Sequence, residues 1–275
     1  MKSREKHFVL VFVIAAFSCE KISNDHYIEI KGKTQHVLTS GKGTPVVVFL
    51  AGGGCDLTDF DSVQRSLSKI TKTFSYDRSG LGKSELVNSP RTLDNVTEEL
   101  KELLEKEGII NDSMILVGHS MGGDVSRYFL HRNPKNIVGL VLIDPGSEFL
   151  SEEYRKTKTE KEIVAEDSLL AIELKSEPIG FQMEVRCYPK HDSLLKTFTI
   201  NTNVPITLLE STKIEGNNPS DKRLIEIQKR LYRNFQRKVP QMKIISTEKS
   251  GHFIQLDEPN LVIDAIKSMI TVVRE

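Results

Sequence analysis

The chain has 275 residues, of which 38% are hydrophobic, enough for one domain with a sizeable core. Its 38 Lys and Arg residues balance its 38 Asp and Glu residues, so the formal charge is zero. This balance argues against a nucleic-acid-binding protein, which normally carries a basic excess or a basic stripe.

Residues 1–19 have the pattern of an export signal. Three basic residues, the last of them Lys6, precede an apolar stretch over 8–17, whose length matches a signal-peptide core. The stretch ends just before Cys19, as in a bacterial lipoprotein signal, in which the cysteine is lipidated and becomes the first mature residue. An ordinary cleaved secretory signal is the alternative. Both predict a mature domain over 20–275 in the bacterial periplasm or cell envelope, and the first adds membrane anchoring through lipidated Cys19.

The rest of the chain alternates runs of β-branched and apolar residues with helical patterns. The runs predict strands over 27–30, 34–39, 46–50, 73–76, 114–117, 137–143, 206–209 and 242–246. Apolar residues at helical spacing predict helices over 59–70, 93–107, 121–131, 220–235 and 260–273. This alternation is typical of βαβ units, which build a mostly parallel sheet with helices on both faces. The first two strands, joined by a tight turn, would form an antiparallel edge.

The segment 146–203 interrupts this alternation. It is rich in charge and carries helical patterns without a strong strand. Its position after the strand 137–143 predicts a helical cap or lid over the carboxyl ends of the strands, where such sheets bind ligands. Its apolar side chains either line an acyl pocket or pack the cap onto the sheet, and packing is the default; they include Phe181, Met183, Tyr188 and Phe198.

The strongest chemical signal lies at 115–123, where the sequence ILVGHSMGG leads from a strand through G-x-S-x-G into a helix. In such a turn Ser120 adopts strained backbone angles, and side chains at Gly118 and Gly122 would collide with neighbouring backbone. The turn presents the Ser120 hydroxyl at a helix N-terminus, whose partial positive charge favours a developing anion. This context predicts a nucleophile rather than an ordinary loop serine.

Two further motifs accompany this serine. DRSGLGKS occupies 77–84 after a predicted strand, and SGHF occupies 250–253 after the last predicted strand. Together with GHSMG at 118–122, they resemble the D-x-x-G-x-G-x-S loop, the late histidine loop and the nucleophile elbow of the α/β-hydrolase superfamily, over nearly all of 27–273. The resemblance implies an α/β fold with a mostly parallel eight-stranded sheet, flanking helices and a cap. Because this fold carries many chemistries, it does not name the substrate.

His252 is the candidate general base. It follows a predicted strand in a loop and lies where the chain order Ser, acid, His requires the histidine. An imidazole has a near-neutral pKa, which suits it to take the serine proton and return it to the leaving group. His119, which adjoins the nucleophile along the chain, is expected to point away from it.

The oxyanion hole needs two backbone N–H groups aimed at the developing charge. One is expected from Met121, the residue after the nucleophile. The other is expected from Gly53, in the glycine run 52–54 after the third predicted strand, because glycine lets the backbone approach a substrate closely. A phosphate-binding loop is disfavoured, since no G-x-x-x-x-G-K-[ST] pattern follows.

The acid of the triad is ambiguous in the sequence. The commoner family arrangement places it in the loop after the strand 206–209, where this chain has lysine and isoleucine at the expected positions. A minority of the family takes the acid from the end of the preceding strand, where Asp144 stands. Asp144 is therefore the preferred acid and Glu210, at the end of the next strand, is its rival. Two weaker candidates are Glu148 and Glu215.

These residues predict a carboxylesterase-like serine hydrolase that cleaves a small-molecule acyl substrate through an acyl-enzyme, without a cofactor. A cofactor-free perhydrolase or a carbon–carbon hydrolase on the same fold is an alternative. A binding protein without catalysis is another, although the intact Ser120 and His252 argue against it.

Apart from Cys19, the chain holds Cys55 and Cys187. The sequence does not decide whether they lie within bridging distance of each other. With no C-x-x-C and no close His/Cys cluster along the chain, the sequence predicts no metal site.

Overall fold

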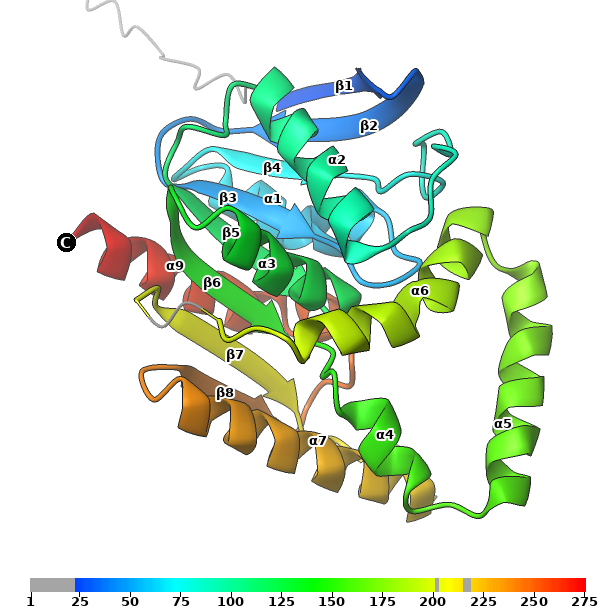
Figure 1. Ribbon diagram of the computed structural model, residues 1–275. Coiled ribbons are helices and arrows are strands. Elements are labelled where there is room, and N and C mark those ends of the chain that lie inside the picture. The colour runs from blue at the N-terminus through cyan, green and yellow to red at the C-terminus, as the bar shows by residue number, and fades with distance from the viewer. Residues whose placement is uncertain (1–22, 201–202, 215–218) are drawn as a thin grey trace, which may run out of the picture.

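The computed structural model describes residues 23–200, 203–214 and 219–275, and within them one sheet of eight strands organises the chain (Figure 1). The strands are β1 Ser23–Ile30, β2 Lys33–Ser40, β3 Val46–Leu50, β4 Thr73–Tyr76, β5 Met114–His119, β6 Ile137–Ile143, β7 Ile206–Ser211 and β8 Lys243–Thr247. Across the sheet they run β1-β2-β4-β3-β5-β6-β7-β8. The pairs β1–β2 and β2–β4 are antiparallel and the others are parallel. The predicted mostly parallel sheet with an antiparallel edge is confirmed.

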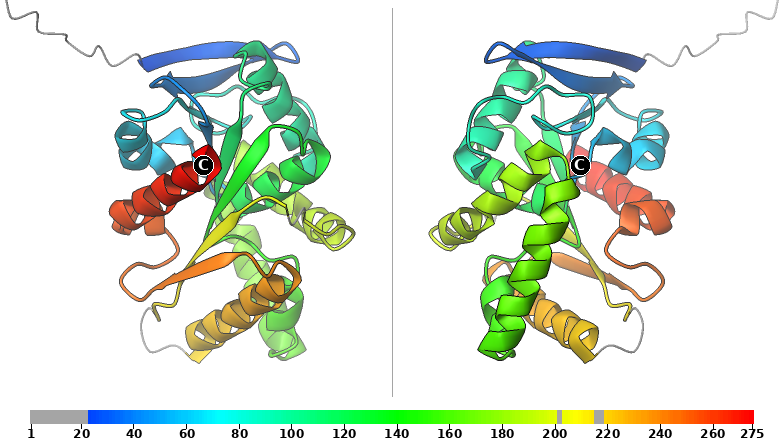
Figure 2. Two further views of the ribbon diagram at one scale, coloured as in Figure 1. Left: turned by 90° about the vertical axis from the view of Figure 1, so that its left-hand side faces the viewer. Right: turned by 90° about the vertical axis from the view of Figure 1, so that its right-hand side faces the viewer.

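Helices cover both faces of the sheet. They are α1 Asp61–Leu67, α2 Leu93–Lys106, α3 Met121–Arg132, α4 Leu150–Arg155, α5 Glu160–Glu173, α6 Ile179–Leu195, α7 Pro219–Lys238, α8 Ile254–Asp257 and α9 Pro259–Arg274, with 3-10 turns η1 Leu57–Phe60 and η2 Leu174–Ser176. Helices α1 and α9 lie on one side of the sheet, and α2, α3 and α7 on the other (Figure 2).

The continuous apolar strands follow from this layering. Successive side chains of a strand point to opposite faces, so a strand covered on both faces needs apolar residues at every position. In β3, Val46 and Val48 belong to the cluster under α2 and α3, whereas Val47 and Phe49 belong to the cluster under α1 and α9. The two clusters hold the strands rigidly, and the loops at their carboxyl ends start from fixed positions.

Several predicted elements differ from those observed in their bounds, and two of them show why. The predicted helix 59–70 is a 3-10 turn followed by α1, which ends at Leu67. Ile70 had completed the apolar stripe, but it is 43% exposed because the chain has already left the helix to enter β4. The first strand begins at Ser23 rather than at residue 27. Its added residues are polar and all but His26 are exposed, so they show no apolar pattern in the sequence.

Residues 146–203, predicted as a cap insertion, contain α4, α5, η2 and α6 in their described part. Helix α6 crosses the carboxyl ends of the central strands, while α5 stands away from the sheet (Figure 1). No residue of α5 is buried.

The predicted export signal at 1–19, with Cys19, lies outside the described residues and stays a prediction. Within the described ranges, none of the helices is both long and apolar enough to cross a membrane.

Candidate active site

Ser120 occupies a strained turn between β5 and α3. Its φ of 49° and ψ of −122° lie outside the regions that L-residues normally adopt. A Cβ atom on Gly122 would lie 2.0 Å from the carbonyl oxygen of Leu50, and one on Gly118 would lie 2.4 Å from the carbonyl oxygen of Gly122. The steric reason for G-x-S-x-G is therefore present in the structure.

Asp144 and His252 meet by a direct hydrogen bond. Asp144 follows the last residue of β6, and its Oδ2 lies 2.7 Å from Nδ1 of His252. The other carboxylate oxygen accepts hydrogen bonds of 3.1 Å from the backbone N–H of Ser211 and from the Gln228 side-chain amide. The carboxylate is buried, whereas the His252 side chain is 46% exposed. A buried, doubly held acid can fix both the orientation and the tautomer of the imidazole.

The rival acids lie elsewhere. Glu210 is fully buried, and its carboxylate accepts hydrogen bonds from the Arg233 guanidinium and the Ser246 hydroxyl. Glu148 pairs with Arg127 at 2.8 Å. Glu215 lies outside the described residues.

The loop that carries His252 is fastened next to the nucleophile. His119 precedes Ser120, and its Nε2 lies 3.1 Å from the His252 carbonyl oxygen, which can only accept. The centroids of the two imidazole rings are 4.8 Å apart. Among the described contacts, the Ser120 hydroxyl makes no hydrogen bond to the His252 ring, a bond that in many enzymes tightens only in the substrate complex.

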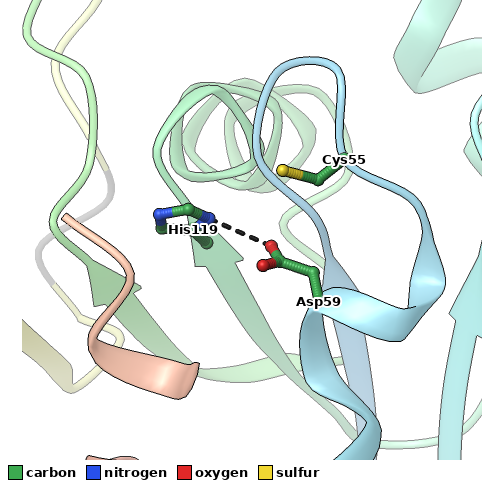
Figure 3. Close-up of side chains that lie close together, drawn as sticks. All are labelled: Cys55, Asp59 and His119. Carbon is green, nitrogen blue, oxygen red and sulfur yellow. Dashed lines mark hydrogen bonds and ion pairs between the residues drawn. The ribbon is translucent and has the colours of Figure 1, made fainter. Parts of the chain in front are cut away.

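His119 also joins this loop to the glycine run (Figure 3). Its Nδ1 lies 3.0 Å from Asp59 Oδ2, which in turn accepts from the backbone N–H of Gly52 at 3.2 Å. Gln255, in α8 just after His252, donates to the other Asp59 oxygen at 2.7 Å. Burial opposes ionisation of Asp59, but the hydrogen bond and charge of His119 outweigh it and lower the Asp59 pKa. His119 therefore braces the two loops, a role that its expected orientation away from the nucleophile did not predict.

Cys55, Asp59 and His119 place one possible metal-ligand atom each within 4.8 Å of one another (Figure 3). The sequence had predicted no metal site from the spacing of its Cys and His residues, and spacing alone does not reveal this cluster. Asp59 and His119 already bond to each other, and burial raises the pKa of the Cys55 thiol to about 12, which keeps the thiol protonated. Both Cys55 and Cys187 are free thiols.

The glycine run presents one free N–H between two that are bound. The N–H of Gly52 donates to Asp59, and that of Gly54 donates to Glu184 at 3.3 Å. For the N–H of Gly53, no acceptor is found in the described part of the chain. Met121 is the first residue of α3, a position whose N–H has no partner within a helix. The two groups predicted to bind an oxyanion are thus the ones left available.

Arg78 fixes the carbonyl side of the same loop. Its guanidinium donates to the carbonyl oxygens of Ala51 at 2.7 Å and Gly52 at 2.6 Å, and it also pairs with Glu184 of α6. Asp77, the first residue of the motif 77–84, accepts hydrogen bonds from the backbone N–H groups of Leu57 and Lys83. The reach of Arg78 was not foreseen, because its partner lies 106 residues away in the cap.

A cavity of about 550 Å³ opens between α4, α7 and the segment 198–200. Pro145 and Gly146, which follow Asp144, form part of its wall, and aromatic and basic side chains form much of the rest. Neither Ser120 nor His252 lines it. The cavity adjoins the acid side of the site, and its wall reaches the serine turn, because the backbone N–H of Gly146 donates to the carbonyl oxygen of Ser120 at 3.3 Å.

Comparison with known proteins agrees with this architecture. The model of the alpha/beta hydrolase fold family matches residues 45–166. YqjL of Bacillus subtilis, an uncharacterized protein, is 31% identical over 134 residues, which are 46% of this chain and 52% of that protein. The match thus spans about half of that relative's length, and less of the next two.

Solved structures are similar in fold at low identity. An esterase from Thermogutta terrifontis has a TM-score of 0.64 at 18% identity, covering 93% of this chain and 100% of its own. An epoxide hydrolase from Vigna radiata has a TM-score of 0.64 at 17% identity, covering 90% of this chain and 98% of its own. Together with the eight-stranded sheet and the match of the family model to residues 45–166, these likenesses show that the chain has the α/β-hydrolase fold.

Proposed function

We propose that this protein is a serine hydrolase that cleaves an ester or related acyl bond of a small molecule through an acyl-enzyme. The observation that carries the proposal is the 2.7 Å hydrogen bond between Asp144 and His252, made by a loop that is fastened beside Ser120. The T. terrifontis neighbour, described as an esterase, agrees with this choice, although its likeness is one of fold.

In the proposed reaction, Ser120 Oγ attacks the substrate carbonyl while His252 Nε2 takes the serine proton. Asp144 holds the opposite ring nitrogen and stabilises the imidazolium that forms. The N–H groups of Gly53 and Met121 stabilise the oxyanion of the tetrahedral intermediate. His252 then protonates the departing alcohol. Water, deprotonated by the same imidazole, releases the acid from Ser120.

The test is a comparison of wild type with Ser120→Ala. Wild type should hydrolyse p-nitrophenyl esters and should gain the mass of one fluorophosphonate adduct on Ser120. Ser120→Ala should lose turnover by about 10⁴-fold or more, since removing a triad member leaves only the contribution of the oxyanion hole and binding. Ser120 is half-buried and its hydroxyl makes no hydrogen bond among the described residues, so we expect the thermal midpoint to change little.

Ser168→Ala, on the exposed helix α5, is the matched control and should behave as wild type in both assays. Full activity in Ser120→Ala, or a fluorophosphonate adduct on another residue, would rule out the proposed nucleophile. A screen of ester, lactone and amide substrates then defines the acyl class.

A further inference from the structure

One face of helix α6 lies against the glycine run. Phe181, Glu184 and Tyr188 are spaced so that they share that face of the helix. A Cβ atom on Gly54 would lie 2.9 Å from the Phe181 ring, and one on Gly53 would lie 2.3 Å from the Tyr188 hydroxyl oxygen. The cap therefore contacts the backbone that carries the predicted oxyanion donor.

A buried ion pair locks this contact. Arg78 Nε donates to one oxygen of Glu184 at 2.6 Å, and Nη2 donates to the other at 3.1 Å. Both side chains are at most 2% exposed. Because the same guanidinium binds two carbonyl oxygens of the loop, α6 and the glycine run form one rigid unit.

The Tyr188 hydroxyl is available inside this unit. Tyr188 is half-buried and its ring packs against the core cluster beneath α2 and α3, and among the hydrogen bonds of the described residues its hydroxyl takes part in none. A tyrosine hydroxyl without a protein partner beside the glycine run is free to donate to a bound ligand. Burial raises the pKa of Tyr188, and the negative charge of Glu184 adds to this, so the phenol stays neutral and able to donate at neutral and moderately alkaline pH.

We propose that Tyr188 donates a third hydrogen bond to the oxyanion of the transition state, beside the N–H groups of Gly53 and Met121. The inference rests on the proposed serine hydrolase activity and extends the catalytic machinery into the cap. The phenol keeps its proton throughout: the oxyanion forms as Ser120 attacks, accepts the hydrogen bond, and collapses when the alcohol leaves. Glu184 acts as a positioning residue, since it holds α6 on the loop through Arg78.

Tyr188→Phe is the primary test, because it removes the hydroxyl and keeps the ring. We expect kcat for a p-nitrophenyl ester to fall by about 10²-fold, the effect of losing one oxyanion donor, with KM changed little. A trifluoromethyl ketone forms a tetrahedral adduct with an oxyanion, so its affinity should fall by a similar factor. Tyr128→Phe is the matched control: it removes a hydroxyl that pairs with Asp94 on α2, and kcat should stay at the wild-type value.

A second variant keeps the hydroxyl in place, so its result does not depend on whether Tyr188→Phe changes the fold. Replacing Tyr188 with a fluorinated tyrosine makes the phenol more acidic, and the phenolate cannot donate. We expect kcat/KM of this variant to decline at a lower alkaline pH than in wild type, in step with the absorbance of the phenolate.

Two outcomes separate the inference from the function beneath it. If Ser120→Ala abolishes turnover while Tyr188→Phe keeps wild-type kcat and inhibitor affinity, and the fluorinated variant keeps the wild-type pH profile, the third donor is overturned and the hydrolase stands. If wild type forms no adduct at Ser120, the proposed function itself fails.

Discussion

At the scale of single residues, two acids competed for one role. Asp144 and Glu210 close neighbouring parallel strands, so the sequence places both carboxylates at the same edge of the sheet. The structure separates them by their partners, because Asp144 contacts His252 while Glu210 contacts Arg233 and Ser246. Both carboxylate oxygens of Glu210 accept hydrogen bonds in the structure, and none of these bonds comes from His252.

Asp144→Asn should therefore impair turnover and Glu210→Gln should not. Asparagine can donate to Nδ1 of His252 and so favours the wrong tautomer, for which we expect kcat to fall by about 10³–10⁴-fold. In Glu210→Gln the Arg233 ion pair is lost, and we expect a lower thermal midpoint with kcat within a few-fold of wild type. Steady-state kinetics and thermal unfolding of both variants check this. A collapse of kcat in Glu210→Gln alone would reverse the assignment.

The sequence predicted the residues that are fixed by local backbone chemistry. The two flanking glycines identify Ser120, and the position after the last strand identifies His252. The bracing side chains carry no such local signal: Arg78 meets Glu184 across 106 residues, and Asp59 meets Gln255 across 196. Contacts over such separations follow from the packing of the cap and loops, which a single sequence does not specify.

At the scale of elements, the strands were predictable because each is covered on both faces and must be apolar throughout. Within the cap, a charged and nearly aperiodic segment predicted helices without their bounds. Helix α5 explains the difficulty. Its apolar residues are distributed around the helix, and several are exposed, including Val164 at 57% and Ile172 at 62%. Because α5 has no buried face, its sequence carries no apolar stripe from which the bounds of the helix could be predicted.

We expect α5 to exchange its amide hydrogens much faster than α6. An isolated helix of this length is marginally stable in water, and α5 relies on a capping box at Thr159 and on surface ion pairs such as Arg155 with Asp167. Helix α6, by contrast, is held by the buried pair of Glu184 and Arg78. Hydrogen exchange followed by mass spectrometry, on peptides from each helix, measures the difference.

Thr159→Ala should accelerate exchange in α5 further and leave α6 unchanged, since it removes only the N-terminal cap. Equal protection of α5 and α6 would contradict the expectation and would mean that the exposed face of α5 is covered in solution.

At the scale of the whole molecule, the fold joins a rigid two-faced core to a cap whose α6 is held to the glycine run by Arg78 and whose α4 packs against α7. The family motifs account for the core, and the structure adds these contacts of the cap.

The side chain of Asp124, near the start of α3, is a buried carboxyl. Its Oδ1 lacks any hydrogen bond in the described residues. Burial raises the pKa of Asp124 to about 7, helped by Glu148 and Asp192 and opposed by Arg127.

This carboxyl should make the folded state less stable as pH rises. In the unfolded chain an aspartate ionises near pH 3.9, whereas folded Asp124 keeps its proton until about pH 7. Between these values the unfolded state gains charge first, so the free energy of unfolding declines and then levels off above pH 7. Asp124→Asn removes this dependence. We expect it to unfold like wild type near pH 4 and to be more stable above pH 7, by an amount of order 2–4 kcal/mol.

Urea unfolding of wild type and Asp124→Asn at pH 5, 6, 7 and 8 measures the effect. The difference between their free energies of unfolding should widen as the pH rises. Asp167→Asn is the matched control, because Asp167 is exposed and its hydrogen bond with Arg155 lowers its pKa, the opposite direction. Its substitution should show no gain in stability with pH, since exposed ion pairs contribute little. Parallel pH profiles for wild type and Asp124→Asn would mean that the folded protein ionises Asp124 as readily as the unfolded chain does, with Arg127 outweighing the cost of burial.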